Sequence, residues 1–413
     1  MARIGALVLL AVALAAAGPA ARAARPPSGS GADTGPHTLR AAAAAPPRAP
    51  SAGWMWPSSW ASALWPWAPR AGVAEAEEDE CETGDIRKFG LKLLREMPFA
   101  GLFEDLKDVT KFEASGMTSA RGKLWIVFDN LHAIGRIDEH FQFRSGDNIL
   151  LGHVGEDSQF EGLAYDEQTG HFYVVEEVVE QGDTHLHPVA QEVEMDERTH
   201  AYRIIERCPI HYQLSHANKG FEGIHYFRDP RDPRRELLMG LCEGNFCKGG
   251  RRGRESGNGR LVVSEFYKNA SGCGWDVVKV VDIPRSAFFM DYSGLDVRDS
   301  KIAITSQEDS ALWIGTFDFE ALEFIEPDSE RVYHFPRDNH CQMIFCNVEG
   351  IAWLDDSRFI IASDKAKSTQ PYRCITHDQS IGIFALPVAP DDAAPPSPTG
   401  GAAAKGGGDD EAE

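Results

Sequence analysis

The amino-acid sequence predicts an all-β protein, a five-bladed β-propeller with six blades as the alternative, over residues 85–387. Short segments rich in Val, Ile, Tyr, Phe and Trp alternate there with clusters of Gly, Asp, Asn and Pro, the pattern of strands and turns. Strand patterns do not alternate with helix patterns, so antiparallel sheets are expected. A short motif also recurs at intervals that suit propeller blades.

The recurring motif is Glu or Ser, then Gly, then an aliphatic residue. It begins at Ser115, Glu161, Glu222, Ser293 and Glu349. The first strand of each propeller blade lines the central axis, where backbones crowd and glycine has no side chain to clash. The motif therefore predicts five inner strands. Because the last unit offers only three strands, ending at residues 381–385, a segment before Ser115 should complete its blade.

A second set of polar residues follows the motif at a fixed distance. Fifteen residues after the start of the motif come Asn130, Glu176, Glu308 and Asp364. In the third unit, an insertion at residues 228–235 lengthens the turn, and the acidic residue is Glu243. A hairpin of two short strands brings such a residue back beside the motif. We therefore expect both sets to face one end of the channel, with Asp129, Glu177, Asp296 and Asp309 nearby in the sequence.

Carboxylates that converge in this way repel one another unless a cation neutralises them or some take up protons. The donors are oxygens, and His225 is the one imidazole in the repeat, which favours calcium over zinc. The predicted calcium ligands are Glu161, Glu222, Glu349, Glu243 and Asn130. The alternative is a solvated acidic rim that binds no metal.

Three pairs of segments carry a resemblance to known proteins: FEGLAY (160–165) with YVVEE (173–177), YSGLD (292–296) with SQEDS (306–310), and VEGIAW (348–353) with ASD (362–364). They resemble the SdiA-regulated and esterase-like phytase families of β-propellers, over roughly residues 110–387. The resemblance implies a calcium-associated propeller, with phosphoester or ester hydrolysis in some members. This chain departs from those families in its Trp-rich leader, its cysteines and the basic insertion at residues 248–254.

Two functions stay open on the sequence. In a metal-assisted hydrolase, Glu176, Glu308 or Asp364 would activate water, and His225 would act as the acid. The chain has no Gly-x-Ser-x-Gly motif, which argues against a serine hydrolase. The alternative is a non-enzymatic, calcium-stabilised extracellular scaffold that binds protein or glycan.

The basic insertion also has two interpretations. Arg251, Arg252 and Arg254 would suit a phosphate substrate, whereas a solvated Gly/Arg loop is the simpler interpretation. The sequence alone favours the solvated loop.

The segments outside the propeller have their own patterns. Residues 1–24 combine a charged start, an apolar run and a small-x-small site, which predicts a secretory signal peptide. Residues 25–84 and 388–413 are rich in Ala, Pro and Gly, with acidic ends, and are predicted to be disordered. The helical spacing of apolar residues in 85–97 predicts a helical lead-in over 85–106.

Eight cysteines behind a signal peptide predict disulfides and a secreted protein. Cys242 with Cys247, and Cys341 with Cys346, would each close a short local loop. Asn269 begins an N-glycosylation sequon, which fits the secretory route.

The charge of the chain limits its partners. A formal net charge of −22 argues against nucleic acid and anionic lipid. Five tryptophans from Trp54 to Trp67 would suit a membrane interface, but Pro57 and Pro66 interrupt any helix there and no basic residues flank the cluster. We expect a monomer that acts on a small phosphoester or ester, or that binds an extracellular protein or glycan.

Overall fold

The computed structural model describes residues 89–387, except for 105, 107–108, 156, 182–184, 217–218 and 326–330, and except for the side chains of 178–181 and 185. The predictions for residues 1–24, 25–84 and 388–413 lie outside the described residues, and so does the tryptophan cluster. No helix in the described part of the chain is long and apolar enough to cross a bilayer.

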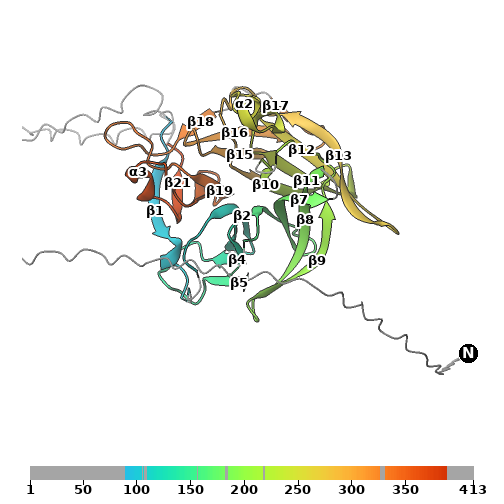
Figure 1. Ribbon diagram of the computed structural model, residues 1–413, viewed down its shortest axis with the longest axis horizontal. Coiled ribbons are helices and arrows are strands. Elements are labelled where there is room, and N and C mark those ends of the chain that lie inside the picture. The colour runs from blue at the N-terminus through green and yellow to red at the C-terminus, as the bar shows by residue number, and fades with distance from the viewer. Residues whose placement is uncertain are drawn as a thin grey trace, which may run out of the picture. The chain divides into compact units, whose positions relative to one another are not determined.

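Five antiparallel sheets surround a central axis, which confirms the predicted five-bladed propeller against the six-bladed alternative (Figure 1). The inner strands are β2 (Ala114–Ala120), β6 (Phe160–Tyr165), β10 (Phe221–Asp229), β14 (Gly294–Arg298) and β19 (Val348–Trp353). Each motif lies at the beginning of an inner strand or directly before it. Neighbouring inner strands contact one another in that order, and β19 returns to β2.

Three further strands complete each of the first four blades. They are β3 (Lys123–Phe128), β4 (Leu131–Ile137) and β5 (Ile149–His153); β7 (Phe172–Gln181), β8 (His185–Asp196) and β9 (Ala201–Pro209); β11 (Asp232–Cys242), β12 (Arg260–Asn269) and β13 (Gly272–Asp282); and β15 (Lys301–Ser306), β16 (Ala311–Asp318) and β17 (Glu323–Ile325). Strand β18 (Arg331–His334) also pairs with β16. Strands such as β3 are buried almost throughout because each blade packs between two others, which explains their apolar runs.

Short helices lie in the connections between strands. They are η1 (Phe99–Gly101), η2 (Asn245–Cys247), α2 (Gly250–Gly253) and α3 (Tyr372–Ile375). None exceeds four residues, so the described part of the chain is all-β.

The last blade joins the two ends of the described chain, in the order β1 (Lys92–Pro98), β21 (Ser380–Ala385), β20 (Arg358–Ser363) and β19. This confirms that a segment before Ser115 completes the blade. It also shows that the predicted helix is wrong, because residues 92–98 form a strand that is antiparallel to β21. Local spacing permits a helix, but the open edge of β21 offers backbone hydrogen-bond partners, and this tertiary pairing overrides local propensity.

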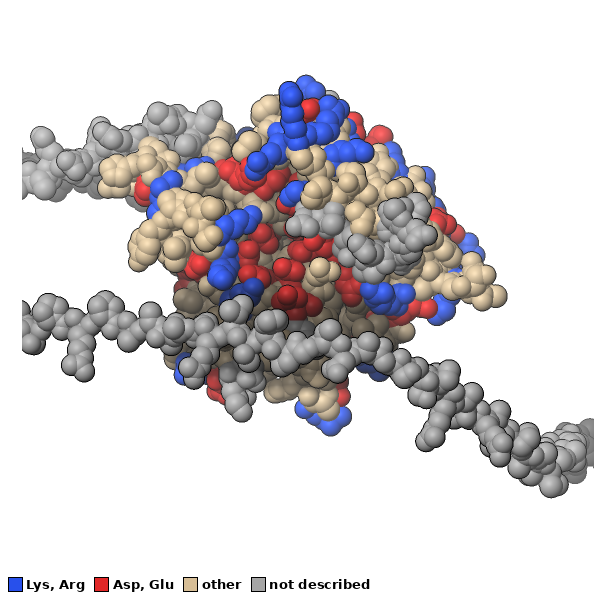
Figure 2. Space-filling model, in the orientation of Figure 1, with Lys and Arg blue, Asp and Glu red and all other residues tan. Residues whose placement is uncertain are grey.

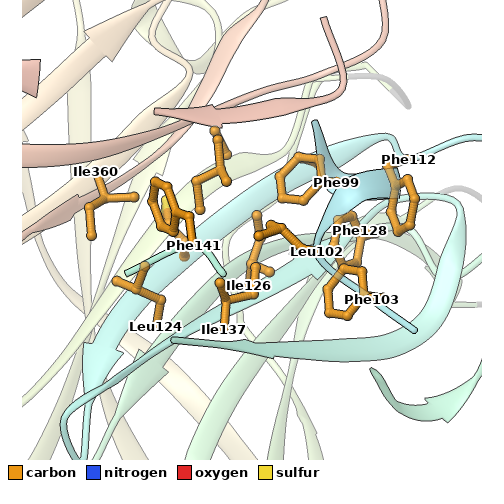
Figure 3. Close-up of a cluster of buried hydrophobic side chains, with 14 of the residues drawn as sticks. Phe99, Leu102, Phe103, Phe112, Leu124, Ile126, Phe128, Ile137, Phe141 and Ile360 are labelled. Carbon is orange, nitrogen blue, oxygen red and sulfur yellow. The ribbon is translucent and has the colours of Figure 1, made fainter. Parts of the chain in front are cut away.

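Apolar side chains fill the spaces between neighbouring blades. In Figure 3, Phe99 from η1, Phe128 from β3 and Ile360 from β20 meet in one cluster between the first and last blades. The rings of Phe99 and Phe128 pack edge to face, with their centroids 5.3 Å apart. Such packing fixes how the inner strands lie around the axis.

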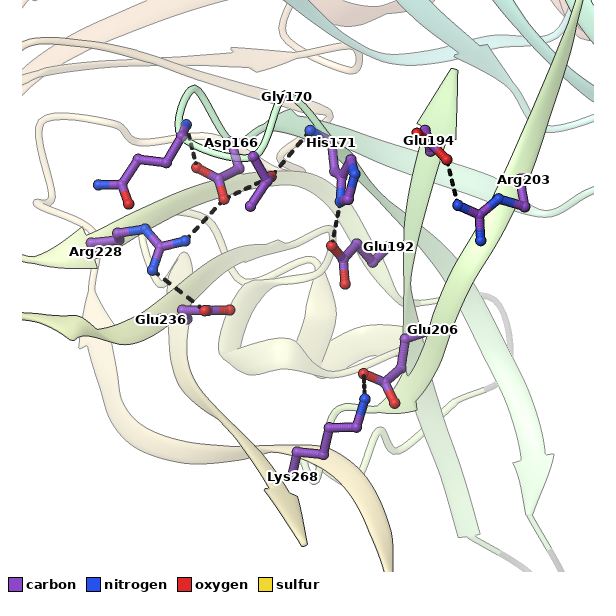
Figure 4. A network of polar contacts seen from close by, with 12 residues as sticks. Asp166, Gly170, His171, Glu192, Glu194, Arg203, Glu206, Arg228, Glu236 and Lys268 are labelled. Carbon is purple, nitrogen blue, oxygen red and sulfur yellow. Dashed lines mark hydrogen bonds and ion pairs between the residues drawn. The ribbon is translucent and has the colours of Figure 1, made fainter. Parts of the chain in front are cut away.

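Polar contacts also join neighbouring blades, as Figure 4 shows for the second and third. Arg228 Nη2 of β10 lies 3.0 Å from Oδ2 of Asp166, the residue after β6. Lys268 Nζ of β12 lies 2.9 Å from Glu206 Oε2 of β9. Exposed pairs contribute little, but the Asp166 side chain is buried, so its pairing with Arg228 satisfies a desolvated charge.

The glycine of each motif allows neighbouring inner strands to approach closely. A Cβ atom at Gly294 would overlap the carbonyl oxygen of Glu349, and one at Gly350 would overlap that of Ser115. A Cβ at Gly223 would lie 2.8 Å from the backbone nitrogen of Leu295. The predicted crowding of backbones at the axis is therefore present.

Two predictions concerned local disulfides. The Cys242–Cys247 bond is present, with a Cα–Cα distance of 5.1 Å. The predicted Cys341–Cys346 bond is wrong, because Cys346 pairs with Cys374 of α3 and Cys341 forms a different disulfide. Folding brings α3 beside Cys346, a proximity that the spacing of residues in the sequence does not show.

A third disulfide, Cys208–Cys273, links β9 to β13 in the neighbouring blade. Three such bonds are typical of an oxidising compartment. Asn269 lies exposed at the end of β12, directly before the turn to β13, where a glycan would have room. Secretion and glycosylation stay predictions.

Candidate metal centre

The glutamates of the motif lie in β-bulges, which aim their side chains at the axis. Phe160 and Gly162 pair with successive residues of β7, so Glu161 has no partner between them. The pairing shifts in the same way around Glu222 in β10 and Glu349 in β19. A bulge bends its strand and redirects the extra side chain.

A pocket of about 440 Å³ opens at this end of the channel, and we call it the acidic mouth. Eight carboxylates and three lysines line it: Glu113, Asp129, Glu161, Glu177, Glu222, Glu243, Glu349 and Asp364, with Lys219, Lys365 and Lys367. Figure 2 shows acidic side chains gathered in the central hollow and basic ones around it. The fold thus brings together five of the predicted site residues: Glu161, Glu222, Glu243, Glu349 and Asp364.

The closest group in the acidic mouth comes from two adjacent blades. Carboxylate oxygens of Glu177, Glu222 and Glu243 all lie within 4.8 Å of one another. Glu177 accepts a hydrogen bond from the backbone of Gly220 at 3.2 Å, and Glu243 pairs with Lys219. These two contacts hold the outer carboxylates in place around the buried Glu222.

Two further carboxylates of the acidic mouth, Glu161 and Asp364, differ in their hydrogen-bond partners. The Ser115 hydroxyl lies 2.6 Å from Oε2 of Glu161, across the boundary between the first two blades. Asp364 has a buried Oδ1 that no described group hydrogen-bonds. An unpaired buried carboxylate oxygen is costly, and burial here favours the protonated form of Asp364.

Burial and mutual repulsion raise the pKa values of these carboxyl groups. Glu161 and Glu222 are only 8% and 7% exposed, and burial, followed by neighbouring carboxylates, raises the pKa of each well above its usual value. Burial and Asp364 do the same to the pKa of Glu349. Burial raises the pKa of Glu177 and of Asp364 to about 7. A bound cation would relieve this repulsion.

Two predicted site residues lie outside the acidic mouth. Asn130 Oδ1 accepts a hydrogen bond from the backbone of Glu113 at 2.8 Å, and its Nδ2 donates to the carbonyl of Lys111 at 3.2 Å, so it anchors a loop. Glu176 contacts Gln191 and Arg207 on the outer side of β7. Neither reaches the other carboxylates, and Glu177 takes the place predicted for Glu176.

Glu308 and His225 are also separated from that group. Glu308 Oε1 lies 2.5 Å from Arg254 Nη2, in an adjoining pocket. His225 lies near the other end of the channel, where it lines a pocket of about 380 Å³ with Asp296. Burial lowers the pKa of His225 to about 4, so its imidazole is neutral at pH 7. Asp309 accepts a hydrogen bond from the backbone of Met290 instead.

The acidic mouth has the donors that calcium prefers. Its side-chain ligand atoms are carboxylate oxygens, without imidazole or thiolate among the described lining residues. The 4.8 Å triad offers such donors from two adjacent blades. The motif and the polar residues that follow it predicted most of the lining carboxylates. Glu113, directly before β2, was not predicted because it belongs to neither set.

No protein-family model matches the chain, and no curated protein matches it. Among solved structures, the chain is similar to the PQQ-bound aldose sugar dehydrogenase of Streptomyces coelicolor, with 12% identity over 72% of this chain and 98% of that one and a TM-score of 0.41. It is similar to glutaminyl cyclase of Myxococcus xanthus, with 11% identity over 72% and 97% and a TM-score of 0.39. A luciferin-regenerating enzyme matches with 9% identity over 68% and 94% and a TM-score of 0.35. At these values the activity has to be inferred from the acidic mouth itself.

Proposed function

We propose that this protein is a secreted, calcium-binding β-propeller that hydrolyses a phosphoester or ester at its acidic mouth. The observation that carries the proposal is the triad of Glu177, Glu222 and Glu243, whose oxygens lie within 4.8 Å of one another inside a ring of further carboxylates. Eight carboxylates against three lysines leave the lining with excess negative charge, which a divalent cation would offset.

The triad would hold the calcium, and Glu161 and Glu349 line the same pocket and add to its negative charge. Bound calcium polarises a phosphoryl or carbonyl oxygen of a substrate. The triad would fix the position of the ion, and the other carboxylates of the acidic mouth would surround it with negative charge.

Asp364 is the best-placed base for water. Its side chain is partly exposed and lines the same pocket as the triad, and burial raises its pKa to about 7, so it can take up a proton near neutral pH. The water oxygen would bond to the phosphorus or the carbonyl carbon while Asp364 takes a proton from it. The ester bond would break, and the leaving oxygen would take up the proton that Asp364 received, which frees the alcohol and restores the Asp364 carboxylate.

Substrate assays on the full chain test this function. A phosphomonoester, a carboxylic ester and a lactone are each incubated with the protein in calcium or in chelator. We expect one ester class to be hydrolysed in calcium only. Asp364→Asn should abolish turnover and keep calcium binding, while Glu176→Gln, which changes a carboxylate outside the acidic mouth, should keep both.

Two results would refute hydrolysis at the acidic mouth. One is turnover that survives chelation, and the other is turnover that Asp364→Asn leaves unchanged. Calcium binding without hydrolysis of any ester would instead support the non-enzymatic scaffold.

A further inference from the structure

A second pocket, of about 760 Å³, adjoins the acidic mouth and shares Lys219 and Glu243 with it. Its other wall is the basic loop, which we define as residues 248–254 and which contains α2. Basic side chains gather in the upper part of Figure 2, where Figure 1 places α2. A ligand in the acidic mouth would therefore lie beside this loop.

The basic loop is built into the fold. Asn245 is fully buried, and its Nδ2 donates to the carbonyls of Gly253 at 3.1 Å and Met290 at 2.9 Å. Its Oδ1 accepts a hydrogen bond from the backbone of Asn258 at 2.7 Å. The Cys242–Cys247 disulfide closes the chain directly before the loop. The sequence favours a solvated loop, but these contacts anchor the basic loop to the fold at both of its ends.

Two glycines let the loop fold tightly on itself. A Cβ atom at Gly244 or at Gly253 would overlap the carbonyl oxygen of Lys248. The Arg252 guanidinium also lies 3.7 Å from the centre of the Phe246 ring. This packing limits the positions from which Lys248 and its neighbours project.

The charges that line the second pocket do not all pair with one another. Each lining carboxylate has a partner: Glu243 with Lys219, Glu308 with Arg254, Glu255 with Arg252, and Asp291 with the Ser306 hydroxyl. Lys248 and Arg251 also line the pocket, and both are exposed. Their side chains make no ion pair or hydrogen bond with any described residue. Two positive charges are thus left over at the edge of the acidic mouth.

We propose that Lys248 and Arg251 form a subsite for a phosphoryl group of the substrate, beside the calcium site. This inference rests on the proposed function and selects phosphoesters from its two substrate classes. Two neighbouring unpaired cations match the double negative charge of a phosphomonoester, and a guanidinium binds two phosphoryl oxygens at once. A neutral carboxylic ester would gain nothing from these charges.

Binding of inorganic phosphate to the full chain tests the subsite. Isothermal titration is carried out in chelator and in calcium, with nitrate, a singly charged anion, as a second probe. The test variant is Lys248→Gln with Arg251→Gln. The control is Arg198→Gln with Arg234→Gln, which removes the same charge from side chains that are 83% and 89% exposed, the first in a turn and the second in β11, and both outside the two pockets.

We expect the wild type and the control to bind phosphate in chelator more tightly than nitrate. The test variant should bind phosphate at least about tenfold more weakly, as loss of two charge-assisted contacts implies. Equal affinity in the test and control variants would overturn the subsite, and so would phosphate binding that appears only in calcium. If phosphate binds as expected but calcium does not bind, the subsite stands and the proposed function fails.

Discussion

Gly294 lies against the main chain of Glu349 so closely that a Cβ atom would overlap the Glu349 carbonyl oxygen. The two residues belong to adjacent blades, and Glu349 lines the acidic mouth. The position of this carboxylate therefore depends on the absence of a side chain in the neighbouring blade.

Replacing Gly294 by Ala should lower the free energy of unfolding by about 3 kcal/mol, because the two backbones have to move apart. Chemical denaturation measures the loss. Gly146→Ala is the control, since no atom lies within 4 Å of a Cβ there, and it should change stability by less than about 1 kcal/mol. Similar losses in both variants would contradict close packing at Gly294.

Two adjacent glutamates allow a matched test of the calcium site. Glu177 lines the acidic mouth, whereas Glu176 contacts Arg207 outside it. Calcium should raise the melting temperature of the wild type, because a ligand that binds only the folded state stabilises it. Glu177→Gln should remove most of this increase, and Glu176→Gln should retain it. A melting temperature that is the same in calcium and in chelator would mean that the acidic mouth is only a polar rim.

Stability in chelator should fall as the pH rises from about 4 to about 7. The folded-state pKa values of Glu177 and Asp364 are about 7, against ordinary values of 4.5 and 3.8. In this window the folded state binds more protons than the unfolded state, so each increase in pH favours unfolding. The free energy of unfolding should fall most steeply between the ordinary pKa values and the folded-state value of about 7. Above about pH 7 it should level off.

Calcium should suppress this pH dependence, because it replaces the protons as the neutralising charge. Asp296 provides a contrast, since burial raises its pKa to about 7 at the other end of the channel. Asp296→Asn should flatten the pH dependence equally in calcium and in chelator. Denaturation curves across the pH range measure both effects, and stability that rises with pH in chelator would refute the prediction.

Removing a disulfide should lower the free energy of unfolding, and the loss should be larger for a disulfide that closes a longer loop. Cys208–Cys273 spans 65 residues, Cys346–Cys374 spans 28 and Cys242–Cys247 spans five. On the chain-entropy model, these losses are about 4, about 3.5 and about 2 kcal/mol. Paired Cys→Ser variants compared by chemical denaturation test the order. The largest loss from the shortest loop would show that native packing, and not loop entropy, dominates there.

The recurring motif predicted the number of blades because each inner strand faces the same crowding at the axis. Gly294 and Gly350 meet the same need in different blades, so the same residue recurs at the same place. The closing strand was also predictable, because a blade with three strands leaves an open edge. The spacing of apolar residues in 85–97 predicts a helix, and it is the pairing with β21 that makes residues 92–98 a strand.

Five residues of the acidic mouth were predicted by position, but Glu177 was predictable only to within one position. A regular hairpin would place residue fifteen beside the motif, but the bulge leaves Glu161 unpaired and pairs Phe160 with Glu176. Directly paired residues share a face, so Glu176 follows the buried Phe160 away from the axis, and Glu177 faces the channel. Asn130 fails for a different reason, since its amide binds backbone groups that no repeat in the sequence reveals.

The pairing of β1 with β21 sets the order in which the protein can finish folding. A ribosome releases β1 early, but its partner emerges only after Ser380 has been made. Until then β1 and β20, both strands of the last blade, have open edges, which are templates for pairing with other chains. Synthesis of the propeller therefore ends in one late closing step, and chains that stop before residue 380 should aggregate instead of forming a smaller ring.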